Sequence, residues 1–112
     1  MASTHVLESM GITVLRGFLN GFQALMYVQE NEDKVIDFIL LDLAMPILDG
    51  YETCKQLIEH YEESETQPAK IFAYSGFVNE ETRKKALETG FDEILLTPIE
   101  ATSVEQVILP RL

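Results

Sequence analysis

The stretch IDFILLDLAMPILDG, residues 36–50, decides how the rest of the sequence is interpreted. Phe38 to Leu41 are all apolar, which is typical of a strand buried on both faces, as in a parallel sheet. Asp42 ends this run, and Met-Pro and Asp-Gly pairs then turn the chain before a helix. Open α/β sheets place their ligand sites at the carboxyl ends of their strands. The stretch therefore predicts that Asp42 lies at the carboxyl end of a sheet, where ligand sites occur.

Further apolar segments alternate with helical patterns along the chain. Strands are predicted at 70–76 and 92–98, and a shorter one, rich in β-branched residues, at 12–16. Helices are predicted at 3–10, 22–30, 50–61 and 79–89, with Asn20 and Asn79 as candidate N-caps of the second and the fourth. A last helix is predicted to open at a Ser103–Gln106 capping box and to be stopped early by Pro110. Alternating strands and helices indicate βαβ units and a parallel sheet.

Composition limits the classes of function. The 112 residues suffice for one domain with one core, and the 46% of hydrophobic residues is ordinary for a globular protein. A net charge of −11 argues against direct nucleic-acid binding, which needs basic side chains. No apolar run is long enough for a membrane span, and the single cysteine, Cys54, suits a reducing cytoplasm.

Several chemistry-bearing residues have a plain structural interpretation. Cys54 falls on the apolar side of its helix and is expected in the core. His5 and His60 have no ligand-spaced partners and are expected on the surface, which leaves neither a zinc site nor histidine catalysis. Asp49 is expected to start a helix. Taken alone, Asp42 is as well explained by a structural role, as an acid that makes a turn or caps a helix, as by a functional one.

Three segments together resemble the receiver domains of response regulators. These are FILLDLAMPILDG at 38–50, FAYSG at 72–76 and ALETGFDEILLTP at 86–98, while 11–14 and 20–25 match the second strand and helix of that family. The resemblance covers essentially the whole chain, so residues 1–112 are expected to form a single receiver-like domain. It implies a flavodoxin-like, doubly wound α/β fold, with a parallel sheet and helices on both faces.

The resemblance also implies a chemistry and a site. Receiver domains accept a phosphoryl group on an aspartate from a histidine kinase or a His phosphotransfer protein. Asp42 matches the phosphoacceptor, and Ser75 matches the hydroxyl that hydrogen-bonds a phosphoryl oxygen. A Mg²⁺ ion would be held weakly by Asp42 and by the backbone carbonyl of Ala44.

The sequence also departs from the family pattern in three features. The chain is expected to begin inside the first helix of the family, so the first strand and its acidic metal-binding pair would be missing and the sheet would have four strands. Its exposed edge would then suit pairing with a second copy. Thr97 occupies the position of the family lysine, and Ile94 that of the aromatic switch residue.

Two hypotheses of function follow. The first is a phosphoacceptor in a cytoplasmic His-to-Asp phosphorelay, with Asp42 modified. The second is a degenerate pseudo-receiver that binds partner proteins without phosphorylation. Neither is an enzyme with its own turnover, and neither involves a membrane or direct contact with nucleic acid.

Overall fold

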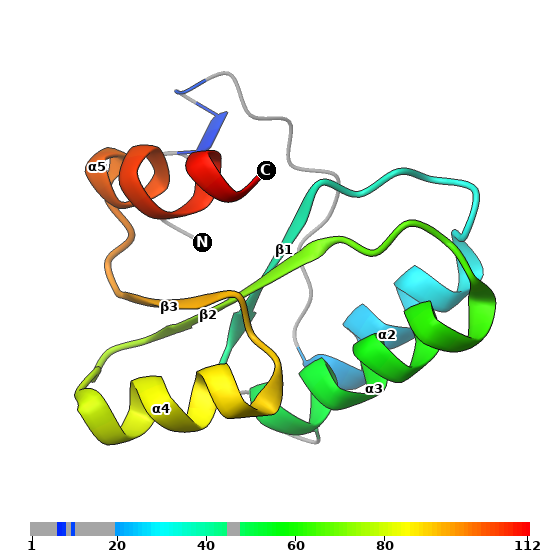
Figure 1. The fold of residues 1–112 in the computed structure, drawn as a ribbon, viewed down its shortest axis with the longest axis horizontal. Helices are drawn as coiled ribbons and strands as arrows, with labels where there is room; N and C mark the ends of the chain where they lie inside the picture. Colours follow the sequence, from blue (N-terminus) through cyan, green and yellow to red (C-terminus); the bar gives the residue numbers. More distant parts are fainter. Residues whose placement is uncertain (1–6, 9, 11–19, 45–47) are drawn as a thin grey trace.

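A parallel three-stranded sheet forms the centre of the computed structural model, which describes residues 7, 8, 10, 20–44 and 48–112 (Figure 1). The strand order is β1-β2-β3, and every pair is parallel. The strands are β1 (Phe38–Asp42), β2 (Lys70–Ser75) and β3 (Glu93–Leu96). This confirms the predicted α/β fold with a doubly wound parallel sheet. The fourth strand predicted at 12–16 lies outside the described residues.

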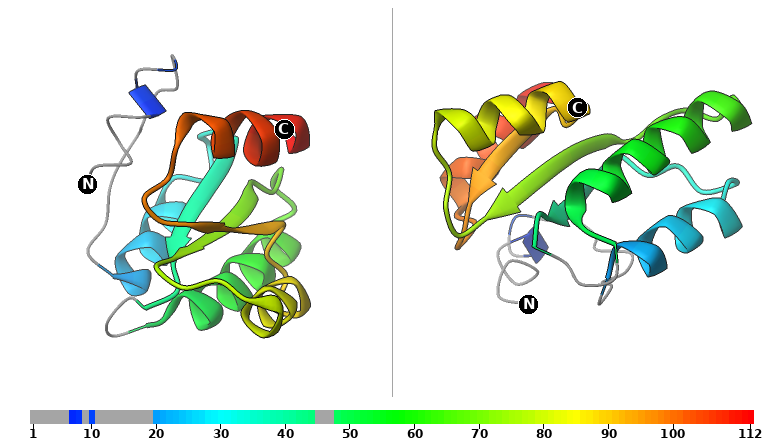
Figure 2. Two further views of the ribbon diagram at one scale, coloured as in Figure 1. Left: turned by 90° about the vertical axis from the view of Figure 1, so that its left-hand side faces the viewer. Right: turned by 90° about the horizontal axis from the view of Figure 1, so that it is seen from below.

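Both faces of the sheet are buried, each against its own set of helices (Figure 2). On β2, Ile71 and Ala73 join the core formed with α2, α3 and α4, whereas Phe72 joins the core on the opposite face with the C-terminal helix. Leu7 also packs into this second core. The alternation of side chains along a strand thus divides one apolar run between two cores.

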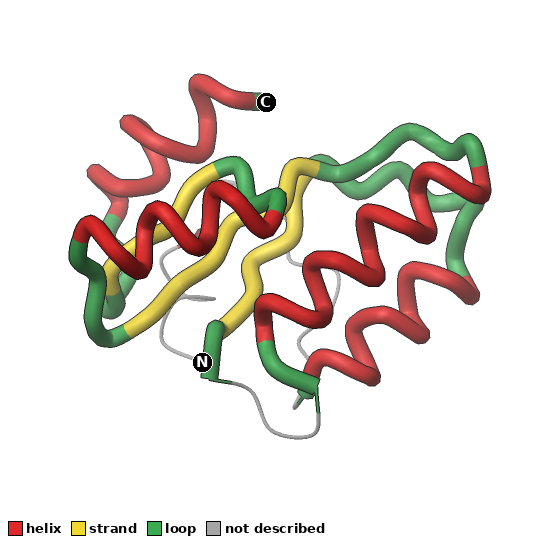
Figure 3. The backbone as a smooth tube through the Cα atoms, turned by 60° about the horizontal axis from the view of Figure 1, so that its bottom comes forward, coloured by secondary structure: helices red, strands yellow, loops and turns green. Residues whose placement is uncertain are grey.

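Helices α2 (Gly21–Glu30) and α3 (Gly50–Ser64) lie side by side on one face of the sheet (Figure 3). Each begins at the cap that the sequence predicts. The Gln23 N–H donates to Asn20 Oδ1 (2.9 Å), and the Glu52 N–H donates to Asp49 Oδ1 (2.9 Å). Helix α3 extends three residues beyond Tyr61, where its apolar pattern ends, and carries Cys54, which is fully buried as predicted.

Helix α4 (Glu80–Thr89) buries only one residue, Ala86, although the sequence indicates core contacts for Leu87 as well. Polar contacts supply its other anchors. Arg83 makes a bidentate ion pair with Glu93 on β3, with N···O distances of 3.0 and 2.9 Å. The Lys85 ammonium lies 4.1 Å from the ring centroid of Tyr51 on α3. The apolar pattern of the sequence does not reveal these anchors.

The C-terminal helix differs from its prediction. It opens at α5 (Ala101–Ser103), continues as a π-helical segment (Val104–Ile108) and ends as a 3₁₀ turn (Leu109–Arg111). Ser103 lies inside the helix and makes no capping hydrogen bond, so the predicted Ser103–Gln106 capping box is wrong. Pro110 sits in the 3₁₀ turn and does not stop the helical path, because the first positions of a helical turn need no backbone N–H donor.

The surface position predicted for His60 is also wrong. Its side chain is 11% exposed and lies against α2, with Nε2 3.5 Å from Oε1 of Glu32. His5 lies outside the described residues. Among the helices that the structure does describe, none is long and apolar enough to cross a membrane.

Candidate functional site

Asp42 is the last residue of β1 and is half-buried at the carboxyl end of the sheet. Its Oδ1 accepts a hydrogen bond from the Ala44 N–H (2.9 Å), which makes a local turn. The Leu43 N–H donates to the Tyr74 carbonyl (3.2 Å), so pairing with β2 continues one residue beyond Asp42. The carboxylate is therefore positioned by a regular strand on one side and a tight turn on the other.

Gly50 brings the start of α3 against this strand end. A Cβ atom added to Gly50 would lie 2.6 Å from the Asp42 carbonyl oxygen and 2.8 Å from the Leu43 Cα. The Gly50 N–H also donates to the Leu43 carbonyl (3.4 Å). The Asp-Gly pair that the sequence indicates as a turn thus serves a second purpose, since only glycine permits this approach of two backbones.

Ser75 and Thr97 lie at the ends of the next two strands. Ser75 ends β2 and pairs in register with Leu96 on β3, and the Thr97 N–H donates to the Ser75 carbonyl (2.9 Å). Ser75 Oγ accepts a hydrogen bond from the Phe77 N–H (3.2 Å). The structure thus brings Asp42, Ser75 and Thr97 to the carboxyl end of the sheet, with Asp42 and Ser75 ending β1 and β2 and Thr97 directly following β3.

Tyr74 is a neighbour of the site that the sequence patterns did not single out. It is the register partner of Asp42, and its pKa is raised, mainly by burial and further by the negative charge of Asp42. The signal that could have found it is its place directly before Ser75 on the strand expected beside Asp42. Its apolar ring joins the second core, so this residue connects the site with the packing beneath it.

The site contains oxygen atoms of the kinds that bind metal ions or form hydrogen bonds, but few charged groups. The Asp42 carboxylate, the Ser75 hydroxyl and the Thr97 hydroxyl come from the strand ends, and the Ala44 carbonyl comes from the turn. No group of three or more His, Cys, Asp or Glu residues suited to a metal ion occurs among residues 20–44 and 48–112 or at the few described positions before them. Chemically, the arrangement offers one nucleophilic carboxylate beside neutral hydrogen-bonding groups.

Solved structures share this fold. A chain from the crystal structure of the CheX–CheY–BeF₃–Mg²⁺ complex of Borrelia burgdorferi aligns with a TM-score of 0.82 and 21% identity, covering 96% of this chain and 76% of that one. The receiver domain of sensor histidine kinase PA1611 from Pseudomonas aeruginosa, solved with magnesium in its active-site cleft, has a TM-score of 0.74 and 23% identity, covering 95% and 81%. At these identities, the similarity establishes the fold alone.

Sequence relatives are much longer proteins. Hybrid signal transduction histidine kinase I of Dictyostelium discoideum is 36% identical over 92 residues, which are 80% of this chain and 5% of that protein. Sensor histidine kinase GacS of Pseudomonas protegens is 29% identical over 104 residues, 93% of this chain and 11% of that protein. The chain thus corresponds to a small part of these kinases. Residues 1–109 match the family model described as the response regulator receiver domain. This chain belongs to the response regulator receiver domain family.

Proposed function

We propose that this chain accepts a phosphoryl group on Asp42 within a His-to-Asp phosphorelay. The observation that carries the proposal is the meeting of Asp42, Ser75 and Thr97 on adjacent strand ends. An Asp42 carboxylate oxygen attacks the phosphorus of a phosphohistidine. The P–O bond forms as the P–N bond breaks, and the imidazole nitrogen keeps the electron pair. Ser75 then donates a hydrogen bond to a phosphoryl oxygen.

The oxygen ligands at the site are of the chemical kinds that Mg²⁺ binds. A carboxylate and a backbone carbonyl are hard oxygen ligands, and Mg²⁺ is commonly held by one or two carboxylates with phosphate and water. We assign Asp42 and the Ala44 carbonyl to this role, where the ion would neutralise charge on the phosphoryl oxygens. Because Asp42 is the one carboxylate that we assign, we expect weak binding.

The phosphoryl donor under this proposal is a histidine kinase or a His phosphotransfer protein. One neighbour in fold comes from the co-crystal structure of the Saccharomyces cerevisiae histidine phosphotransfer protein Ypd1 with the receiver domain of its downstream response regulator Ssk1, and has a TM-score of 0.78 and 23% identity. The relatives include sensor histidine kinases. The role is that of a signalling module without turnover of its own, in the cytoplasm and without nucleic-acid contacts.

The test is the intact mass of the chain after incubation with a small phosphodonor and Mg²⁺. We expect a gain of one phosphoryl group in the unmutated chain, none in Asp42→Asn, and a slower gain in Ser75→Ala. A chelator should suppress the reaction. A gain that persists in Asp42→Asn would place the modification elsewhere and refute the assignment.

A pseudo-receiver is the second candidate, and Thr97 is the observation that favours it. A threonine offers no positive charge to an aspartyl phosphate. If this candidate is correct, neither small phosphodonors nor purified phosphotransfer proteins will add mass, and partner binding will be unchanged by Asp42→Asn.

We further propose that the edge of β1 can pair with a second copy of the chain. Within the described residues, β1 pairs with β2 on one side only, and its first three residues are half-buried. Sedimentation velocity over a range of concentrations should then show a dimer. A monomer at every concentration would remove this proposal.

A further inference from the structure

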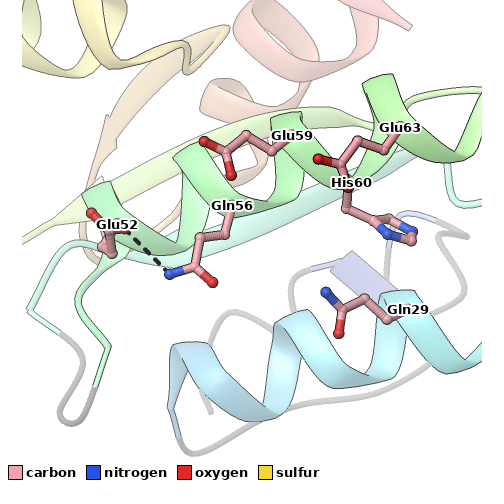
Figure 4. A pocket seen from close by; sticks show the side chains of 6 residues that line it. All are labelled: Gln29, Glu52, Gln56, Glu59, His60 and Glu63. Atoms are coloured by element: carbon pink, nitrogen blue, oxygen red, sulfur yellow. Dashed lines mark hydrogen bonds between the residues drawn. The ribbon is translucent and has the colours of Figure 1, made fainter.

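A hollow of about 250 Å³ opens between α2 and α3 (Figure 4). Gln29 borders it on the side of α2, and five residues border it on the side of α3: Glu52, Gln56, Glu59, His60 and Glu63. Four of them are spaced i, i+4, i+7 and i+11 and so form one row along the helix, the acidic row: Glu52, Gln56, Glu59 and Glu63. Three of the four side chains in this acidic row are carboxylates.

A second row, the apolar row, lies on α2, the helix on the other side of the hollow. Phe22 is 51% exposed and Met26 is 38% exposed. Together with Gln29 they are spaced i, i+4 and i+7, which puts all three on one side of α2. Gln29 is the member of this row that borders the hollow, whereas Phe22 and Met26 precede it on the same side of α2 and do not line the hollow. Aromatic and methionine side chains are enriched in protein interfaces, and neighbouring exposed ones mark interaction surfaces.

The two rows run in the same direction. At one end of the helices Gly21 packs against Thr53, where an added Cβ would collide with the threonine hydroxyl. At the other end Glu32, just beyond α2, lies 3.5 Å from His60 Nε2. From Glu52 to Glu63 the acidic row extends about 16 Å, or three helical turns. The surface is thus long enough to hold a short helix along its length.

The charges around the hollow are almost all of one sign. Helix α2 contains no lysine or arginine, and the single lysine of α3, Lys55, does not border the hollow. The His60 ring lies between the helices beside Gln29 (Figure 4), and its Nε2 has no hydrogen-bond partner within the part of the chain that the structure describes. The floor of the hollow is therefore polar, and one of its walls is acidic.

We infer that the apolar row and the acidic row form a docking surface for an amphipathic helix of a partner protein, with apolar residues on one side and lysine or arginine on the other. Helices bind grooves of this kind through apolar anchors at i, i+3, i+4 and i+7. Phe22 and Met26 would receive those anchors. Glu59 and Glu63 would attract the basic side and fix its direction. This surface does not use Asp42, so it acts whether or not the proposed phosphorylation occurs.

The test uses a synthetic amphipathic peptide of leucine and lysine, about 14 residues long and so about 21 Å as a helix, titrated calorimetrically into the full chain. We compare Glu59→Lys with Glu63→Lys, made together, against the matched pair Glu81→Lys with Glu105→Lys. All four glutamates are exposed, and both pairs change the net charge equally. The first pair should raise the Kd about tenfold or more, and the matched pair less than about twofold.

A second comparison separates docking from simple attraction of cations. Phe22→Ser with Met26→Ser leaves the charge unchanged and should also weaken peptide binding about tenfold, while spermine binding should not respond to it. The inference is overturned if the unmutated chain does not bind the peptide or if both charge-reversal pairs weaken binding equally. It is also overturned if the serine pair has no effect. Circular dichroism of each variant checks that the helices remain folded.

Discussion

At the scale of single residues, Thr97 has the strongest bearing on the proposed chemistry. It lies at the end of β3, hydrogen-bonded through its backbone to Ser75, and brings no charge to the edge that holds Asp42. Phosphoryl transfer is assisted by a cation on the phosphoryl oxygens, and receiver domains have a lysine at the matching position. The sequence is sufficient to identify this substitution, whereas its place beside Ser75 comes from the strand register.

Replacing Thr97 with lysine should accelerate phosphorylation of Asp42 by a small phosphodonor about tenfold, because a fixed positive charge stabilises the transferring group. Intact mass measured over time gives the rate. Thr97→Met, which is of intermediate length and uncharged, is the control. Equal rates for the lysine and methionine variants would show that charge at this position does not matter.

Gly50 gives a second prediction at this scale. Gly50→Ala places a Cβ 2.6 Å from the Asp42 carbonyl oxygen, so the start of α3 has to shift, and we expect a loss of about 1 to 3 kcal/mol in the free energy of unfolding. Urea denaturation measures this loss. Gly76→Ala is the control, since the nearest atom to its Cβ among the described residues would be Thr97 Oγ1, at 3.8 Å. A similar loss in both variants would mean that the close approach at Gly50 is not its cause.

His60 illustrates the limit of sequence reasoning for single residues. Its neighbours in the sequence are polar, which indicates a surface position, yet α2 covers it. Asp42, Ser75 and Cys54 could be placed correctly because each belongs to a strand end or an apolar stripe that is visible locally. The packing of one helix against another involves residues distant in sequence, and no local pattern reports it.

At the scale of elements, an ionic cluster holds α4 to β3 and to the C-terminal turn. The Glu93 carboxylate receives Arg83 in a bidentate pair and lies 3.5 Å from Arg111. Burial tends to raise the pKa of Glu93, but hydrogen bonds from Arg83 and the Ile94 N–H, with the charges of both arginines, lower it overall. This cluster compensates for the short apolar side of α4.

Because the pKa of Glu93 is lowered in the folded chain, its contribution to stability is present above the pKa of an unfolded glutamate, about 4, and is lost as the pH falls through the folded value. At neutral pH, Glu93→Gln should lower the free energy of unfolding by about 1 to 2 kcal/mol, a modest figure because Arg83 is 55% exposed. The difference from the unmutated chain should shrink below about pH 4.

Glu88→Gln, measured in the same way, is the matched control on α4. Its ion pair with Lys84 is 3.9 Å long and exposed, so the change should stay within about 0.5 kcal/mol. An equal loss for both variants, or a Glu93→Gln effect that does not depend on pH, would contradict the role assigned to the cluster.

The sequence predicts some elements of the fold better than others. The strands β1, β2 and β3 and the helices α2, α3 and α4 follow from apolar periodicity and from capping residues such as Asn20, Asp49 and Asn79, and these are confirmed, whereas the strand predicted at 12–16 lies outside the described residues. The predicted start of the C-terminal helix is wrong because Ser103 and Gln106 match a capping box by residue type alone. Its actual start at Ala101 follows an uncapped Glu100 and leaves no signal in the sequence.

At the scale of the whole molecule, the net charge of −11 acts on stability. Repulsion among the acidic side chains opposes the compact state and is screened by salt. Raising the concentration of sodium chloride from about 20 to about 200 mM should therefore raise the Tm by about 2 to 5 °C. Differential scanning calorimetry measures the shift. A falling Tm would show that attractive pairs such as Arg83–Glu93 outweigh the general repulsion.

The burial of Cys54 has a practical consequence. It is the only cysteine of the chain, it is fully buried, and burial together with the negative charge of Asp92 raises its pKa to about 12. Alkylating reagents need an accessible thiolate, so the folded chain should resist them at neutral pH. Each labelling event then records one opening of the core beneath α3. The labelling rate of Cys54 therefore measures how often the interior of the folded chain opens, and no added probe is needed.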